Sequence, residues 1–271
     1  MHATLTELER EAYRKSPVHR IDGRVKIIMT LLLIVYAVAL PRMDLLNFPK
    51  LLLLEAYLAA LILLARLEFS YLAFRFAIAL PFGFSIALLQ PFIKQPFISD
   101  FTVLYRLPFG LEVTGEGMLF GAIIFAKFLV CITAVILLSS TTSLSELVSS
   151  VRRLGMPREL ALLFTMMVRY LFVFWIMLGR IRTAQKTRGF DLWNKNVPRQ
   201  WTLQQVGYTI SSLFIRSYEQ GERTFQSMLC RGYNADAQVY VGKKKLGVPD
   251  VLVLAMASGV VIAAQFGLKF L

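Results

Sequence analysis

Two arginine–glycine pairs carry the clearest chemical signal in this sequence, because they recur with matching neighbours. The phrase Ala184-Gln185-Lys186-Thr187-Arg188-Gly189-Phe190-Asp191 is echoed by Ser227-Met228-Leu229-Cys230-Arg231-Gly232-Tyr233-Asn234. Glycine is the usual residue just after a helix C-terminus, and arginine presents a planar fork of hydrogen-bond donors. One such pair would be an ordinary helix cap. Its repetition after two long helical stretches predicts a shared docking role for Arg188, Gly189, Arg231 and Gly232.

Two charged residues, Glu55 and Lys127, interrupt stretches that are otherwise apolar enough to cross a bilayer. Charges inside a membrane are costly, so they are usually paired or functional. Their expected depths differ by only about 5 Å at 1.5 Å per residue. We therefore expect an intramembrane ion pair, with snorkelling, contact with a partner subunit or a substrate role as alternatives.

Several catalytic signatures are missing from the sequence. It contains no Gly-x-x-x-x-Gly-Lys-Ser/Thr phosphate loop, no His-Glu-x-x-His and no Cys-x-x-Cys. The chain is therefore not expected to be an ATPase or any other enzyme, or to hold a cofactor or a metal. The amine of Met1 and the imidazole of His2 could offer ligands to a metal, but His2 is best explained as a chance histidine. Cys131 and Cys230 fall in different predicted compartments, so they are not expected to form a disulfide.

The composition identifies the elements that must position these residues as membrane helices. The chain is 56% hydrophobic and 17% charged, with a mean hydropathy of +0.59, which predicts an all-α integral membrane protein. A further apolar stretch at 160–178 contains Arg169 and is followed by Arg180, so the helix that holds it is expected to lie in or near the interface plane. The five predicted spans are 25–40, 48–67, 71–91, 117–139 and 248–270.

The basic residues are concentrated in one region. Of 30 Lys and Arg, 16 lie within 140–247, where only 6 acidic residues accompany them. The positive-inside rule places this region in the cytoplasm, and anionic lipid or an acidic protein explains its charge better than nucleic acid does. The predicted organisation is an N-terminal cytoplasmic segment with four membrane helices in 1–139, a coupling domain in 140–247, and a C-terminal membrane helix in 248–271.

Three helices are expected within the coupling domain. The first opens at a capping-box candidate, Ser143 to Glu146, and ends near Gly155. The second runs from Arg158 to Gly189, with apolar residues at helical spacing. The third follows Pro198 and ends at Gly232. Each of the two long helices therefore has an apolar side and a basic end.

These motifs resemble the transmembrane T component of energy-coupling factor transporters, which are ABC-type importers, and most closely its cobalt-transport subgroup, CbiQ. The resemblance covers essentially the whole chain. It departs from the family where Thr187 and Cys230 replace the usual alanine before Arg-Gly, and where Gly23 replaces a proline. The similar stretches are 13–26, Leu154-Gly155-Met156-Pro157, Val168-Arg169-Tyr170-Leu171, 215–219, Glu222-Arg223 and the two Arg-Gly phrases.

The resemblance implies a scaffold in the cell membrane that binds no substrate itself. Two cytoplasmic ATPase subunits, identical or different, would receive Arg188 and Arg231 in their grooves, and their movement would reorient a substrate-binding membrane S component. Cobalt is the leading substrate, followed by nickel and then a vitamin. The alternatives are a secondary transporter acting alone, which would need a polar midplane site or inverted repeats, and a membrane-embedded enzyme, which would need clustered titratable groups.

Overall fold

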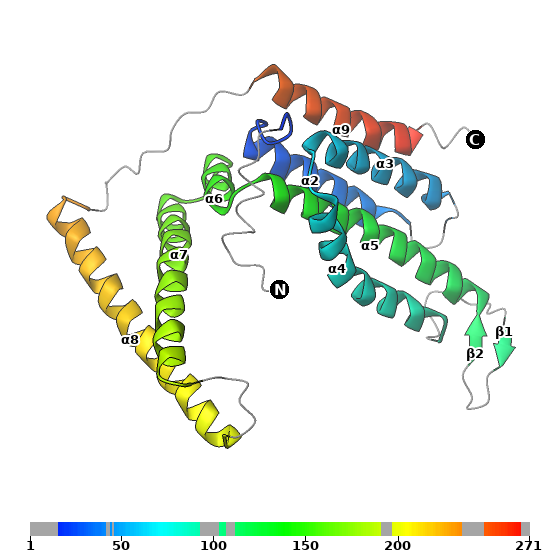
Figure 1. Cartoon of the computed structure of the whole chain (residues 1–271). Helices are drawn as coiled ribbons and strands as arrows, with labels where there is room; N and C mark the ends of the chain where they lie inside the picture. The colour runs from blue at the N-terminus through cyan, green and yellow to red at the C-terminus, as the bar shows by residue number, and fades with distance from the viewer. Residues whose placement is uncertain are drawn as a thin grey trace. The chain divides into compact units, whose positions relative to one another are not determined.

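Apolar runs bounded by turn-forming residues become helices in the computed structural model (Figure 1). It describes residues 16–41, 44, 46–92, 103–106, 112–190, 197–234 and 247–266. The chain divides into two compact units, Met1–Ser150 with Lys244–Leu271, and Val151–Lys243. This division places 140–150 and 244–247 with the first unit, although the sequence analysis assigned them to the coupling domain.

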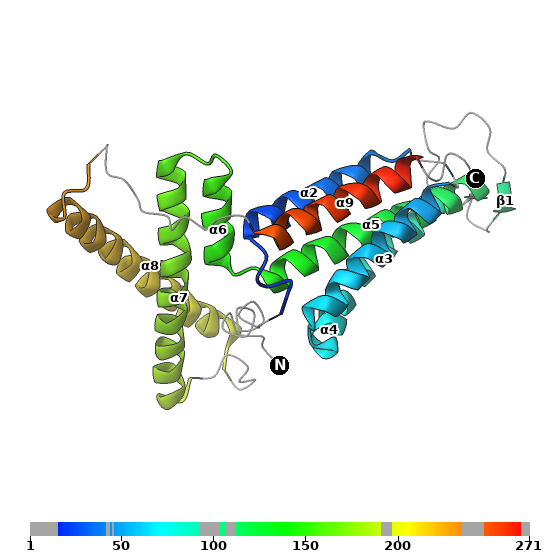
Figure 2. The same cartoon turned by 90° about the horizontal axis from the view of Figure 1, so that it is seen from above.

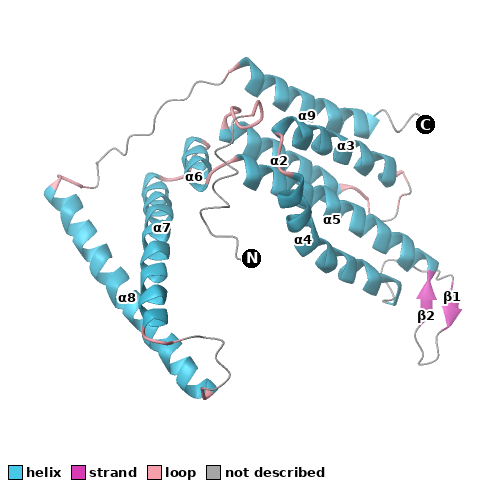
Figure 3. Cartoon of the chain, in the orientation of Figure 1, coloured by secondary structure: helices cyan, strands magenta, loops and turns pink. Residues whose placement is uncertain are grey.

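The predicted all-α class is confirmed, and the helix bounds lie close to those expected from the apolar runs. Two short antiparallel strands, β1 (Val103–Arg106) and β2 (Glu112–Thr114), precede the fourth predicted span (Figure 3). The first unit contains α2 (Gly23–Ala39), α3 (Asn47–Ala65), α4 (Phe69–Leu89), the 3-10 turn η1 (Gln90–Phe92), α5 (Gly115–Thr141), most of α6 (Leu144–Arg153) and α9 (Val248–Phe266). The second unit contains α7 (Arg158–Thr187) and α8 (Arg199–Cys230).

Helix α5 is the centre of the first unit. It packs against α2, α3 and α4, while α9 packs against α2 and α3 (Figure 2). The core between them is aliphatic, with Leu33, Leu54 and Leu137 fully buried. By contrast, α4 leaves Phe74 and Phe82 more than half exposed. A membrane helix with such a surface faces lipid or another subunit, since neither penalises exposed aromatic side chains.

Within the described part of the chain, five helices are long and apolar enough to cross a membrane: α3, α4 with its extension to Phe92, α5, α7 and α9. The number agrees with the prediction, but the membership differs. Helix α2 was predicted as a span and has only 17 residues, at the lower end of the spanning range. Helix α7, predicted to lie in the interface plane, meets the criteria of length and composition. The C-terminal span was predicted to reach 270, and residues 267–271 lie outside the described chain.

Lysine side chains cap two of the membrane helices reciprocally. Lys26, near the start of α2, donates to the carbonyl of Thr141 at the end of α5 at 2.8 Å. Lys127, within α5, donates to the carbonyls of Leu40 at 2.7 Å and Val38 at 3.3 Å, at the end of α2. The last four carbonyls of a helix lack partners within it, and a cation is favoured at that end. Each helix therefore supplies the cation that caps the other.

This capping explains why the structure does not bring Glu55 and Lys127 together as the predicted ion pair. The Glu55 carboxylate instead accepts a hydrogen bond from the Thr133 hydroxyl at 2.8 Å. Its other oxygen, Oε2, is buried without a hydrogen-bond partner among the described residues. The similar bilayer depth expected for Glu55 and Lys127 did not predict their contacts, because the carbonyls at the end of α2 bind the Lys127 ammonium instead.

Replacing Lys127 by methionine tests the cap. The substitution keeps the apolar stem but leaves the carbonyls of Val38 and Leu40 without their donor. We expect a loss of about 1–3 kcal/mol of stability, the usual cost of leaving buried acceptors unsatisfied. The measurement is the melting temperature of the purified protein in detergent, with Lys127→Arg as the variant that keeps the charge. A Lys127→Met protein that melts with the wild type would contradict the cap.

A double-mutant cycle tests the separation of the two charges. Glu55→Gln keeps an oxygen that can accept from Thr133, so it should leave the melting temperature unchanged or raise it. Because Glu55 and Lys127 hold different partners, the effects of Glu55→Gln and Lys127→Met should add to within about 0.5 kcal/mol. A coupling above about 1 kcal/mol in the double variant would restore the ion pair.

Candidate functional site

The two Arg-Gly ends have the same backbone geometry. Arg188 ends α7 with φ −87° and ψ 11°, and Arg231 ends α8 with φ −89° and ψ 9°. The following glycines are left-handed, with φ +78° at Gly189 and +79° at Gly232. A side chain would cost about 1–2 kcal/mol in this conformation. The repeated sequence therefore produces a repeated structure.

Matching hydrogen bonds close both ends. In each, the amide after the glycine reaches back five residues and the glycine amide reaches back three, which is the Schellman pattern. The distances agree to within 0.1 Å: Phe190 N to Gln185 O 3.0 Å, Gly189 N to Lys186 O 3.0 Å, Tyr233 N to Met228 O 3.0 Å and Gly232 N to Leu229 O 2.9 Å. These bonds use carbonyls of the last turn internally, so each helix ends in a firm and well-defined tip.

Each tip presents its arginine and anchors its aromatic residue. Arg188 and Arg231 are exposed, whereas Phe190 and Tyr233 are half-buried. The Phe190 ring packs edge-on against Trp201 of α8, with 5.5 Å between ring centroids. A Cβ built on either glycine would meet nothing within 4 Å. Glycine is therefore required for its backbone conformation and not for lack of room among the residues that the structure describes.

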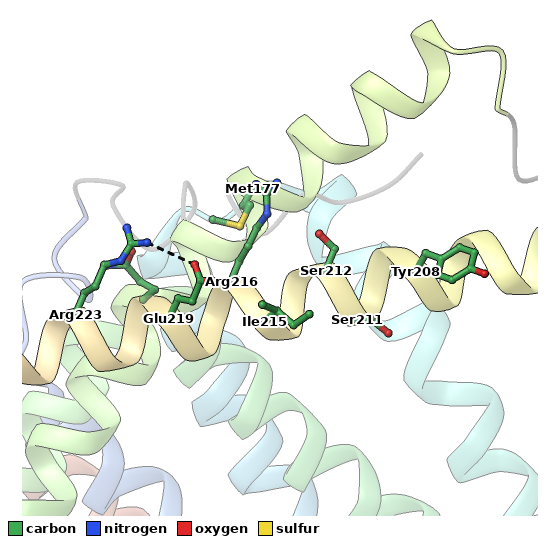
Figure 4. A pocket seen from close by; sticks show the side chains of 9 residues that line it. Met177, Tyr208, Ser211, Ser212, Ile215, Arg216, Glu219 and Arg223 are labelled. Carbon is green, nitrogen blue, oxygen red and sulfur yellow. Dashed lines mark hydrogen bonds and ion pairs between the residues drawn. The ribbon is translucent and has the colours of Figure 1, made fainter.

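Helices α7 and α8 are antiparallel, so the two tips lie at opposite ends of the pair. Tyr170, early in α7, shares a 2.6 Å hydrogen bond with Thr224, late in α8. Gln185, late in α7, donates to Thr209, early in α8, also at 2.6 Å. Midway between these bonds, Met177 and Arg216 line one groove (Figure 4). At 1.5 Å per residue, the tips are separated by up to about 40 Å.

Sequence reasoning missed a contact between two buried aspartates, Asp22 before α2 and Asp250 in the first turn of α9. The backbone N–H of Asp22 donates to Asp250 at 2.8 Å, and Gly247 N–H donates to the other Asp250 oxygen at 2.7 Å. Both aspartates are buried. An Asp directly before or in the first turn of an apolar helix is a cap signature, and both positions carried it. What the sequence did not show is that the two helix starts meet.

Other predicted features sit where they were expected. The Ser143 hydroxyl accepts from the Glu146 N–H at 3.2 Å, which forms one half of the predicted capping box. Gly155, with φ +114°, follows α6. Separately from these features, no three His, Cys, Asp or Glu side chains gather as a metal site would require among the residues that the structure describes.

Comparisons with known proteins identify the family of this chain. The family described as "Cobalt transport protein", CbiQ, matches residues 14–241. The energy-coupling factor transporter transmembrane protein EcfT of Listeria innocua is 27% identical over 227 residues, which are 79% of this chain and 80% of that protein. An uncharacterised protein of Methanocaldococcus jannaschii is 26% identical over 239 residues, which are 86% of this chain and 77% of that protein.

A further relative is a fused cobalt transport protein, CbiMQ, of Methanocorpusculum labreanum, which is 31% identical over 127 residues. That match covers 46% of this chain and 20% of the fused protein. The family match is broader, since it spans most of the chain and includes both Arg-Gly tips. With its long apolar helices, the chain is a multi-pass membrane protein, and it belongs to the CbiQ family of cobalt transport proteins.

Proposed function

We propose that this protein is the transmembrane scaffold of an energy-coupling factor importer, and that it couples two cytoplasmic ATPase subunits to a separate substrate-binding membrane subunit. The observation that carries the proposal is the pair of tips at Arg188 and Arg231, built alike to the level of individual hydrogen bonds. Two like tips at opposite ends of an antiparallel helix pair suit two like partners. One arginine at a helix end is explained by the helix dipole alone, so it is the repetition of the whole tip that supports docking.

The chemistry of the tips suits an acidic groove on each ATPase. A guanidinium pairs with a carboxylate through two parallel hydrogen bonds, which a lysine ammonium cannot reproduce. The Schellman bonds fix the direction in which each arginine leaves its helix. A rigid groove that moves during ATP binding would therefore move the whole helix rather than only a side chain.

The remaining partners follow from charge and exposed surface. The net basic charge of 140–247 favours a cytoplasmic position for both tips. The long helices leave large apolar side chains exposed, among them Met167 and Ile176 of α7 and Phe214 of α8. We assign these faces to the substrate-binding subunit. Cobalt is the proposed substrate on the strength of the family's description, and the scaffold itself would bind no cobalt and hydrolyse no ATP.

Reversing the charge at the tips should uncouple transport. The double variant Arg188→Glu, Arg231→Glu should lose ATPase association and ATP-dependent cobalt uptake by at least about tenfold, because two charge-assisted contacts become repulsive. Arg→Lys at both tips should impair uptake less severely. The assay is pull-down of the ATPases on the tagged chain, followed by uptake in proteoliposomes containing the complete complex.

Arg182→Glu provides the matched control, since Arg182 is exposed on α7 six residues before the tip and the change of charge is the same. It should retain association and uptake. Full association in the double tip variant, or equal loss in the Arg182→Glu control, would overturn the docking role.

Cysteine labelling tests whether both tips face the cytoplasm and whether α7 crosses the bilayer. Single cysteines replace the exposed Lys186 and Gln226 after Cys131 and Cys230 have been changed to serine. Both should be protected from a membrane-impermeant maleimide in sealed right-side-out vesicles and should react once the vesicles are opened. Labelling of only one of them in sealed vesicles would show that a span separates the tips.

A further inference from the structure

An open groove of about 690 Å³ lies where α7 and α8 cross (Figure 4). Its lining combines two kinds of surface. Met177 and Ile215 provide an apolar part, while Arg216, Arg223, Glu219 and neighbouring hydroxyl groups provide a polar part with more positive than negative charge. The groove belongs to neither tip, so ATPase docking does not account for it.

The arginines of the groove are available to an anion. Arg216 is exposed, and its side chain extends toward Met177 of α7 (Figure 4). It makes no hydrogen bond or ion pair with the residues that the structure describes. Arg223 pairs with Glu219 at 3.5 Å, but both side chains are more than half exposed. Such a surface pair is worth little, so Arg223 can exchange its partner for a better one.

The spacing suits a single phosphate group and its immediate neighbours. Arg216 and Arg223 lie seven residues apart, so they share one face of α8 at a separation of about 10 Å along the axis. Ser212 lies one turn before Arg216 and adds a hydroxyl donor to the groove. Glu219 lies between them on the same face and pairs with Arg223, so a bound anion would replace the Glu219 carboxylate as the partner of Arg223. Both guanidinium side chains are long enough to converge on that anion, and they favour phosphate because its oxygens accept paired hydrogen bonds.

The apolar part of the lining favours a phospholipid over an acidic protein segment as the source of negative charge. An acidic protein segment would use the arginines but would leave Met177 and Ile215 without an apolar partner. A phospholipid satisfies both parts of the groove, since its phosphate and its acyl chains are joined. A basic group beside exposed apolar side chains is also the usual arrangement of a helix at the membrane interface.

We propose that the groove binds one anionic phospholipid, with its phosphate at Arg216 and Arg223 and the start of its acyl chains along Met177 and Ile215. The bound lipid touches both helices and holds the crossing together on the side where the described side chains leave it open. This site is independent of the tips, and the transporter would then depend on anionic lipid in the bilayer.

The test is native mass spectrometry of the full-length protein, released from detergent and titrated with phosphatidylglycerol or phosphatidylcholine. The wild type should retain one tightly bound phosphatidylglycerol and no comparable phosphatidylcholine. Arg216→Gln with Arg223→Gln should weaken phosphatidylglycerol binding by at least about tenfold. Arg182→Gln with Lys186→Gln removes the same charge from exposed positions of α7 outside the groove and should leave binding unchanged.

Three outcomes would overturn the proposal. Equal loss in the groove and control variants would show attraction to net charge alone. Displacement of the lipid by millimolar glycerol 3-phosphate would assign the groove to a soluble phosphate. Unchanged lipid binding in the groove variant, accompanied by loss of the ATPases in pull-down, would assign the arginines to a protein partner. Unaltered circular dichroism of each variant confirms that the comparison is between folded proteins.

Discussion

The carbonyl groups at helix C-termini impose the constraint on which much of this structure depends. A helix cannot satisfy its last four carbonyls by itself, and a membrane offers them no water. The chain meets this constraint in two ways. In the membrane helices, the Lys26 and Lys127 ammonium groups reach across and serve each other's helices. At the ends of α7 and α8, the chain turns back on itself through a left-handed glycine.

The two solutions have different functional consequences. A cap supplied by a neighbouring helix couples the positions of the two helices, so α2 and α5 form a fixed pair at the centre of the first unit. A cap supplied by the following residues needs no neighbour, so it leaves the helix end free to project. The same chemical requirement is therefore met by contacts between helices in one unit and by local turns beside exposed arginines in the other.

The spacing of apolar residues and the positions of glycine and proline were sufficient to predict the helices, because both signals depend only on neighbouring residues. Gly189 and Gly232 correctly predicted the ends of α7 and α8, because each glycine adopts the αL conformation that ends its helix. The partners of Lys127 and Glu55 could not be predicted in this way. Their contacts join residues about 80 to 90 positions apart, and depth in a bilayer restricts only one of the three coordinates that a contact requires. The hydrogen bond from the Asp22 N–H to Asp250 could not be predicted for the same reason, since it also joins residues far apart in the sequence.

Two hydrogen bonds, one on each side of the α7–α8 crossing, hold the angle between the helices, and the crossing divides the two helices unequally. From the crossing at Met177 and Arg216, α7 extends for about 16 Å to Arg188, and α8 extends for about 22 Å to Arg231. Rotation by about 10° therefore carries one tip through about 3 Å and the other through about 4 Å. In the proposed coupling role, equal displacements of the two tips would therefore rotate α7 and α8 by different angles, so that two identical ATPases would drive an asymmetric movement.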